Sequence, residues 1–495
     1  MPDLVPTLLF GLTLLLVVGI GEALRAMGVR PEDSRRFVHA ATGIAVALCP
    51  PFFSEPTGIY ALAVLFVGVN VVAVRRKLFL GMHGIERETW GTVAFPLALI
   101  AALFLCWTLD PGRIYILQTA FLVLAVSDPL AAWVGGRVSR GQYEVNGQTK
   151  TLAGSLAFVT SAGILAAFGI AIWRPDGIGL EEILAGAVLV AGLGGTAEAL
   201  GTKGWDNLWM VLAVVVALVA LDGQPEVAVL LLSAFGVAVA FAAVSYFVGF
   251  LDLSGAMAAG LLAWGVVGLG PLTVGAWGWA AIGFTFFFGS SVLSKLGRRR
   301  KREAETRAAK GSRRDAGQVA ANGGVAGLLL AATPFATDPE GAMVLFLGWC
   351  GAFAAASADT WSTEIGTWVR GQTRDVLRWR PVPPGESGGV SLAGSLGGAL
   401  GAALIAGLAV LFLESASLGA VVLTAGLVGA WADSLLGATV QARFLAPDGS
   451  LTEKPEADGV ALPLARGWRW MTNDRVNLAC TLVGAMVPLV VLWLF

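Results

Sequence analysis

The chain carries ILQTAFLVLAVSD at residues 116–128, an almost wholly apolar run that ends in a carboxylate. Outward from this run, apolar stretches of roughly 17 to 25 residues, long enough to cross a bilayer as a helix, recur at about sixteen positions. Examples lie at residues 4–20, 59–74, 178–200 and 476–494. With 56% hydrophobic and 14% charged residues in 495, the sequence predicts an all-α, polytopic integral membrane protein and excludes a soluble enzyme.

The basic residues fall on one side of the expected spans. Threading the chain back and forth from an outside N-terminus leaves only Arg113 and Arg174 on the outer face. Because cytoplasmic loops carry an excess of lysine and arginine, the opposite face, which carries the other basic residues, is predicted to be cytoplasmic. Its most basic loop, residues 297–314, is interpreted either as an anchor against anionic headgroups or as a collector of a polyphosphate substrate.

Polar residues recur in the same order in the two halves, about 230 residues apart. The first set is Asp128, residues 150–155, Glu198 and residues 206–207, and the second is Asp359, residues 391–395, Asp433, Asn473 and Asn477. Carboxylates at the ends of membrane helices are costly to desolvate, so their repetition predicts two related polar sites. A polar break with turn residues at 222–225 separates the predicted domains, residues 1–221 and 226–495.

The first set suits a magnesium-nucleotide site. Asp128 is expected at a helix end that water and a metal ion can reach, and Asp128 and Glu198 are the predicted metal ligands, with Asp206 as a third carboxylate. Lys150 precedes a helix start at which backbone N–H groups could approach a phosphate. The remaining predicted nucleotide or phosphate contacts from this pattern are Gly135, Arg137, Thr151, Gly154, Ser155 and Asn207.

The second set repeats the carboxylates but not the lysine. Asp359 and Asp433 are the predicted metal ligands, and Glu364 is a further catalytic candidate. Asp359 and Glu364 would lie about 140° apart on a helix, so they are expected to share a site only if the helix ends or bends between them. The predicted nucleotide or phosphate contacts are Asn322, Gly389, Ser391, Gly394, Ser395, Asn473 and Asn477.

Aligning the two Leu-Ala-Gly-Ser elements places Val390 opposite Lys150. The second site would therefore need a phosphate-binding cation from elsewhere. The candidates are Arg374, Arg378, Arg380, Arg466 and Arg469, which could instead be topology anchors. They belong to two long loops, residues 373–389 and 442–475, that are candidates for closing over a nucleotide.

Three elements of the first half resemble the dolichol kinase and phytol kinase family: RRFVH at 35–39, SDPLAAWVGGR at 127–137 and KTLAGS at 150–155. The resemblance covers roughly residues 1–221 and implies a membrane enzyme that phosphorylates an isoprenoid alcohol, typically with CTP. It adds Arg36 and His39 as phosphate or hydroxyl contacts, although His39 could also be a hydrogen-bonded packing residue. Ala153 stands where the family often has glutamate. The aspartate and the Lys-Thr-x-x-Gly pattern also resemble the phosphatidate cytidylyltransferases.

The second half resembles the transmembrane protein 19-like family, which includes phytyl-phosphate kinases. The resemblance rests on QVAANGG at 318–324, SADTWSTEIG at 357–366, GGVSLAGS at 388–395, ADSLLGA at 432–438 and NDRVN at 473–477, and it covers about residues 226–495. It implies transfer of a second phosphate onto a prenyl monophosphate.

Together these patterns support the hypothesis of a bifunctional isoprenoid lipid kinase. It would phosphorylate a prenyl alcohol of the phytol or geranylgeraniol type to the monophosphate and then to the diphosphate, a tocopherol-type precursor, with CTP and Mg²⁺. The expected partners are these lipids, a nucleoside triphosphate and the bilayer, and not nucleic acid. The alternatives are a membrane cytidylyltransferase and a transporter, because many carriers are built from repeated halves.

Overall fold

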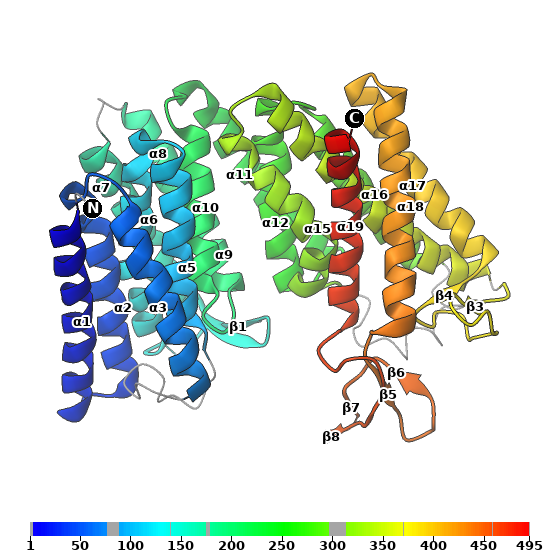
Figure 1. Cartoon of the computed structure of the whole chain (residues 1–495), viewed down its shortest axis with the longest axis horizontal. Helices are drawn as coiled ribbons and strands as arrows, with labels where there is room; N and C mark the ends of the chain where they lie inside the picture. The colour runs from blue at the N-terminus through cyan, green and yellow to red at the C-terminus, as the bar shows by residue number, and fades with distance from the viewer. Residues whose placement is uncertain are drawn as a thin grey trace. The chain divides into compact units, whose positions relative to one another are not determined.

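The structure is a computed structural model of the whole chain (Figure 1). It describes residues 3–76, 89–138, 140–174, 179–296, 313–369, 371–457 and 459–494. The chain forms two compact units, Met1–Phe235 and Gly236–Phe495, here called unit 1 and unit 2. The division falls within α11 (Ala228–Phe247), beyond the predicted break at residues 222–225.

The predicted all-α membrane class is confirmed. Within the described residues, 12 helical segments are long and apolar enough to cross a membrane. The number of about sixteen spans stays a prediction. Residues 297–312 of the basic loop lie outside the described part of the chain.

Unit 1 is a helical bundle with one β-hairpin. Its helices are α1 (Leu4–Ala26), α2 (Pro31–Leu48), α3 (Thr57–Arg76), α5 (Gly91–Leu103), α6 (Ile114–Gly135), α7 (Leu152–Trp173), α8 (Leu180–Leu189), α9 (Gly195–Leu200) and α10 (Asp206–Leu221). Two π-helical turns, Phe104–Thr108 and Val190–Gly194, continue α5 and α8, and short 3₁₀ turns lie at Pro50–Phe52, Pro111–Arg113 and Pro225–Val227. Strands β1 (Gln142–Val145) and β2 (Gln148–Thr151) pair antiparallel.

Helix α6 forms the centre of unit 1, because it is apolar on every side and packs against α2, α7 and α10. Ile116, Phe121 and Leu124 on this helix are almost fully buried. Lipid tails are as apolar as these side chains, so the hydrophobic effect between helices is weak in a membrane. The helices of unit 1 are therefore held together by close packing.

Unit 2 contains α12 (Leu253–Gly268), α13 (Gly278–Lys295), α15 (Ala316–Ala331), α16 (Pro339–Val369), α17 (Leu392–Leu413), α18 (Ala416–Thr439) and α19 (Asn473–Leu494), with 3₁₀ turns at Gly270–Leu272 and Thr333–Phe335. The two predicted loops hold short strands: β3 (Arg374–Asp375), β4 (Gly389–Val390), β5 (Arg443–Leu445), β6 (Leu451–Thr452), β7 (Glu456–Ala457), β8 (Val460–Ala461) and β9 (Leu464–Arg466). They form three small sheets with the orders β3-β4, β6-β5-β9 and β7-β8.

The long helix α16 is the centre of unit 2 and packs against α15, α17, α18 and α19. Glycines allow this approach: a Cβ atom on Gly401 would lie 2.7 Å from the Ser357 carbonyl oxygen, and one on Gly429 would lie 2.4 Å from the Ala355 Cβ. Small residues at such crossings bring helix backbones together within a membrane.

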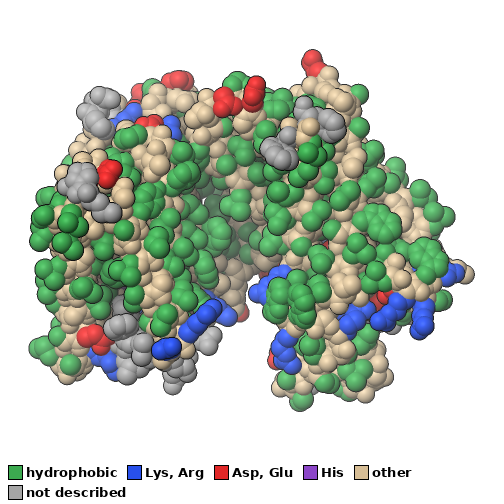
Figure 2. All heavy atoms as spheres, in the orientation of Figure 1, with side chains coloured by type: hydrophobic (Ala, Val, Ile, Leu, Met, Phe, Trp, Pro, Cys, Tyr) green, Lys and Arg blue, Asp and Glu red, His purple; other side chains and the backbone are tan. Residues whose placement is uncertain are grey.

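The surface fits a bilayer environment. Hydrophobic side chains cover the sides of the helices, and most of the lysines and arginines visible on this face lie near one end of the helices of each unit (Figure 2). Arg113 and Arg174, the two arginines predicted on the opposite face, are neutralised by ion pairs: Arg113 with Asp222 at 3.3 Å and Arg174 with Glu182 at 2.8 Å.

Candidate functional site

A cluster of three carboxylates lies in unit 1, from α6, α9 and α10. Asp128, Glu198 and Asp206 each present an oxygen atom within 4.8 Å of the others. Glu198 is buried, and its carboxylate accepts a hydrogen bond of 2.5 Å from Lys150 Nζ on β2. Burial alone would lower the pKa of Lys150, but the Glu198 carboxylate outweighs this effect and raises the pKa above its usual value. Lys150 is therefore a cation at neutral pH, fixed beside the cluster.

Local sequence explains how Lys150 reaches this place. Asn146 and Gly147 both have positive φ values, 51° and 69°, in the two-residue turn between β1 and β2. Such Asn-Gly turns match the twist of a hairpin. The hairpin ends at Thr151, whose hydroxyl accepts a hydrogen bond of 3.1 Å from Gly154 N–H and caps the N-terminus of α7. Turn and cap together hold Lys150 next to α9.

Gly154 is required for close packing. A Cβ atom there would lie 2.9 Å from the Ala131 carbonyl oxygen and 3.3 Å from the Gly135 Cα. Its N–H is already bonded to Thr151, and the N–H of Leu152 is bonded to the Gly141 carbonyl. The glycine therefore serves the contact between α6 and α7, and two of the first N–H groups of α7 are used within the protein.

The expectation that Asp128 lies at a helix end is wrong. Helix α6 continues through Pro129 to Gly135, α16 continues beyond Asp359 to Val369, and α18 continues beyond Asp433 to Thr439. These aspartates lie within apolar helices and still face polar pockets. The apolar run does not predict the helix end, because the following residues are also apolar or small.

The polar pocket of unit 1 has a volume of about 460 Å³. The predicted residues that line it are Arg36, His39, Asp128, Gly135, Lys150, Thr151, Gly154, Ser155, Glu198, Asp206 and Asn207. Arg137 does not belong to this lining: its guanidinium lies 3.8 Å from the centre of the Trp133 ring and bonds the Trp133 carbonyl. The sequence analysis missed Arg35, Gln142 and Thr149, which also line the pocket.

His39 both packs and faces the pocket. Its Nε2 atom lies 3.3 Å from the Leu124 carbonyl oxygen and 3.6 Å from Asp128 Oδ2, so the tautomer with a proton on Nε2 suits both acceptors. The ring also packs edge-on against Phe95. His39 is therefore a hydrogen-bonded packing residue that also lines the polar pocket, and its contact with a phosphate or hydroxyl group stays a prediction.

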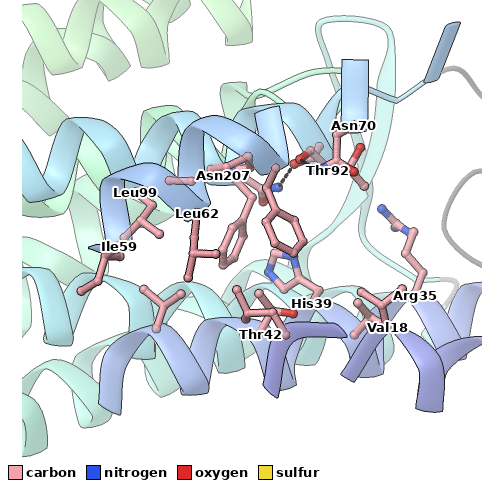
Figure 3. A pocket seen from close by; sticks show the side chains of 18 of the residues that line it. Val18, Arg35, His39, Thr42, Ile59, Leu62, Asn70, Thr92, Leu99 and Asn207 are labelled. Carbon is pink, nitrogen blue, oxygen red and sulfur yellow. Dashed lines mark hydrogen bonds between the residues drawn. The ribbon is translucent and has the colours of Figure 1, made fainter. Parts of the chain in front are cut away.

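An apolar pocket of about 120 Å³ adjoins the polar one (Figure 3). Side chains such as Val18, Ile59, Leu62 and Leu99 line it. It shares four lining residues with the polar pocket: Arg35, His39, Gly91 and Asn207. In unit 1 an apolar pocket and a charged pocket therefore lie side by side with a common wall.

Unit 2 repeats this arrangement. A polar pocket of about 520 Å³ is lined by all ten predicted residues of the second set: Asn322, Asp359, Glu364, Gly389, Ser391, Gly394, Ser395, Asp433, Asn473 and Asn477. A smaller apolar pocket of about 60 Å³ shares Arg314, Gln318 and Asn322 with it. Ser391 caps α17 by accepting a hydrogen bond of 3.1 Å from Gly394 N–H, as Thr151 caps α7.

The carboxyl groups of Asp359 and Asp433 lie close enough to hydrogen-bond each other. Asp359 and Glu364 both line the pocket although α16 is a continuous helix between them, so the predicted bend is not required. Asp359 lies close to Asp433 on α18, whereas Glu364, five residues further along α16, acts electrostatically on Arg314.

Both clusters fit a divalent cation. Among the described side chains, Asp206 Oδ1 in unit 1 and Asp433 Oδ1 in unit 2 are buried oxygen atoms without a hydrogen-bond partner. Buried carboxylate oxygens are costly to leave unpaired, and oxygen ligands are what Mg²⁺ prefers.

The loop between α18 and α19 supplies one further carboxylate to unit 2. Glu453 lines the pocket and accepts hydrogen bonds from Gln441 Nε2 at 2.9 Å and Ser387 Oγ at 3.3 Å. Arg443, only 2% exposed, lies 3.3 Å from Glu453 and 3.6 Å from Glu386. These contacts join both predicted loops to the pocket rim.

The apolar helices and the paired polar and apolar pockets define an integral membrane protein with amphiphile-shaped sites. The chain belongs to the DUF92 family of integral membrane proteins, which matches residues 236–485.

Three curated proteins are similar to parts of this chain. The chain is 30% identical to "Protein PGR" of Arabidopsis thaliana over 263 residues, 48% of this chain and 87% of that protein. It is 28% identical to "Phytol kinase" of Synechocystis sp. over 200 residues, 39% of this chain and 81% of that protein. An uncharacterized membrane protein of the same Synechocystis strain is 25% identical over 224 residues, 43% of this chain and 75% of that protein. No solved structure matches the chain. The resemblance to transmembrane protein 19 and the fusion of two enzymes stay predictions.

Proposed function

We propose that the protein is a membrane-bound kinase of prenyl lipids, in which unit 1 phosphorylates an isoprenoid alcohol and unit 2 phosphorylates the resulting monophosphate. The observation that carries the proposal is the contact, in each unit, between an apolar pocket and a pocket of clustered carboxylates. The similarity to a protein named phytol kinase supports the chemistry of the first step.

In unit 1 the prenyl tail would occupy the apolar pocket, and its hydroxyl group would lie beside His39 and Asp128. Asp128, Glu198 and Asp206 would hold Mg²⁺, which when bound neutralises phosphate charge. Lys150 would bind the phosphate oxygens of the nucleotide, for which we propose CTP. The alcohol oxygen forms a bond to the γ-phosphorus, the bond from that phosphorus to the β–γ bridging oxygen breaks, CDP leaves, and Asp128 accepts the hydroxyl proton.

In unit 2 the acceptor would be the prenyl monophosphate. Asp359 and Asp433 would hold Mg²⁺, and an oxygen of the lipid phosphate forms the new bond to the γ-phosphorus as CDP leaves. The repeated placement of aspartate, cap and glycine supports this second step. It would keep an amphiphilic intermediate within one protein.

We also propose that both sites face the cytoplasm and that the N-terminus lies outside. Within each unit the short strands, which adjoin the polar pockets, lie at the end where lysines and arginines gather (Figures 1 and 2). Cytoplasmic ends of membrane proteins carry this excess of basic residues.

The experiment uses purified full-length protein in detergent with Mg²⁺, geranylgeraniol or phytol, and CTP labelled at either the α- or the γ-phosphate. A kinase transfers only the γ label to lipid, first as monophosphate and then as diphosphate, and EDTA abolishes the transfer. Transfer of the α label would instead indicate a cytidylyltransferase. Solute uptake by reconstituted vesicles, with neither label in lipid, would indicate a transporter. The embedded position of Asp128 and Asp359 makes this last control necessary, because carriers also place carboxylates within helices.

A further inference from the structure

The polar pocket of unit 2 contains an arginine that the sequence analysis did not assign. Val390 stands opposite Lys150, yet Arg314, which precedes α15, lines the pocket and is the one cation among its described lining residues. The predicted arginines have other partners: Arg374 bonds the Trp379 carbonyl, Arg466 bonds the Gly437 carbonyl, and Arg469 lies over the Phe444 ring. None of the five predicted arginines is among the lining residues.

Arg314 lies where the two pockets of unit 2 meet. It lines both of them, together with Gln318 and Asn322. Arg314 precedes Asp315, the N-cap of α15, whereas Gln318 and Asn322 lie four residues apart within α15 and share one face of the helix. An amphiphile with its tail in the apolar pocket would place its headgroup against these three residues.

The backbone at Arg314 is held firmly. Its N–H donates to the Phe250 carbonyl at 3.2 Å, and its carbonyl accepts from Asp252 N–H at 3.1 Å. Gly255 approaches so closely that a Cβ atom would lie 2.2 Å from the Arg314 carbonyl oxygen. Asp315 and Gln318 then form a capping box at the start of α15. The arginine side chain therefore extends from a fixed point.

The electrostatic setting leaves Arg314 suited to an anion. Burial lowers the pKa of its guanidinium, and Glu364 opposes that effect. Arginine remains charged in proteins even so. A desolvated guanidinium gains from a partner with several acceptor oxygens, and phosphate fits its planar donors in a bidentate manner.

We propose that Arg314 binds the phosphate group of the lipid monophosphate that unit 2 accepts, with Gln318 and Asn322 as neighbouring hydrogen-bonding groups. This inference rests on the proposed second activity. The corresponding junction in unit 1 holds Arg35 and His39, but Arg35 pairs with Glu32 at 3.1 Å and His39 lies beside Asp128. The junction of each unit therefore places an arginine near a carboxylate, Arg35 near Glu32 in unit 1 and Arg314 near Glu364 in unit 2.

The test compares Arg314→Gln with the unaltered full-length protein in equilibrium binding of radiolabelled geranylgeranyl monophosphate without nucleotide. Loss of a charge-assisted contact should weaken binding about 10- to 100-fold. The KM for the monophosphate should rise by a similar factor while the KM for CTP is unchanged, and Arg314→Lys should restore part of the affinity. Diphosphate formation with an unchanged KM for CTP reports that unit 2 of the variant is folded.

Arg313→Gln is the matched control, because Arg313 lies 6.0 Å from the Tyr246 ring and lines neither pocket. It should bind the monophosphate like the unaltered protein. Unchanged binding in Arg314→Gln, or an equal loss in both variants, would overturn the proposal. If the unaltered protein binds the monophosphate through Arg314 but makes no diphosphate, the second activity fails and the phosphate subsite stands.

Discussion

Units 1 and 2 share one arrangement, here called the frame: an aspartate, a glycine seven residues later and a capped helix start against which that glycine packs. They place different charged residues around it. In unit 1 Asp128 precedes Gly135 by seven residues, and in unit 2 Asp359 precedes Gly366 by seven. Each glycine packs against a capped helix start, with a Cβ position 2.8 Å from Thr151 Oγ1 in unit 1 and 3.2 Å from Ser391 Oγ in unit 2. In both units the aspartate therefore lies about two helical turns before the glycine that contacts the cap.

The charges added to that frame differ. Unit 1 sets Lys150 against Glu198 inside the cluster, whereas unit 2 pairs Asp359 with Asp433 and places its cation, Arg314, where the two pockets meet. Under the proposed function this frame would serve two acceptors: a site for an alcohol would need its cation on the nucleotide, and a site for a monophosphate would also need one on the lipid.

A large effect that would sharpen this comparison, second only to loss of Asp128 or Asp359, is expected from Lys150→Met. Removing a fixed cation aimed at phosphate oxygens should lower kcat/KM for alcohol phosphorylation about 100-fold. It also leaves Glu198 buried without its partner. Phosphorylation of supplied geranylgeranyl monophosphate should be unchanged, because unit 2 has Val390 at this position. Equal losses of both activities would show that the two sites are not separate.

A smaller effect is expected when the shared frame is crowded. Gly154→Ala and Gly394→Ala put a methyl group about 3 Å from carbonyl oxygens of α6 and α16, respectively, and such overpacking costs about 1–3 kcal/mol. Each variant should lower the midpoint temperature of heat inactivation of its own unit. The controls are Gly163→Ala, whose new Cβ would meet its nearest neighbours at 3.6 Å, and Gly407→Ala, which has open space. Midpoints that fall equally in the controls would contradict the packing role.

The smallest effect is expected from the caps. Thr151→Ala and Ser391→Ala each remove a hydroxyl that accepts from a helix N–H, a loss of about 1 kcal/mol. Heat inactivation should begin a few degrees lower, with the KM for CTP unchanged, and Thr151→Ser should behave like the unaltered protein. A large rise in the KM for CTP would show instead that the hydroxyl contacts the nucleotide.

Several of these features could be predicted from the sequence and others could not. The repeated order of polar residues predicted two polar sites, and most of each set lines one pocket because the helices that carry these residues pack together. The ends of α6 and α18 could not be predicted, since mostly apolar and small residues continue beyond Asp128 and Asp433, and α16 continues through the more polar residues 360–369. Arg137 was placed wrongly because a residue just after a helix can turn either way, and here it packs on Trp133.

Arg314 was missed because it ends a basic run that reads as a topology signal. The neighbouring signal, Asp315 followed by Gln318 ahead of an apolar helix, is typical of a capping box and marks a helix start. That start packs against α12, which is distant in sequence, and only this contact brings Arg314 to the pocket. Tertiary contacts of this kind are not readable from one sequence.

The central claim is that one chain holds two separate kinase sites. It is tested most directly by substituting, one at a time, the two aspartates proposed to bind metal. Asp128→Asn and Asp359→Asn should each remove several kcal/mol of transition-state stabilisation, on the order of a 1000-fold loss in the activity of their own unit. With labelled CTP, Asp128→Asn should fail to phosphorylate geranylgeraniol yet convert supplied geranylgeranyl monophosphate to diphosphate. Asp359→Asn should accumulate the monophosphate. Loss of both activities in each variant, in protein that stays folded, would contradict the account.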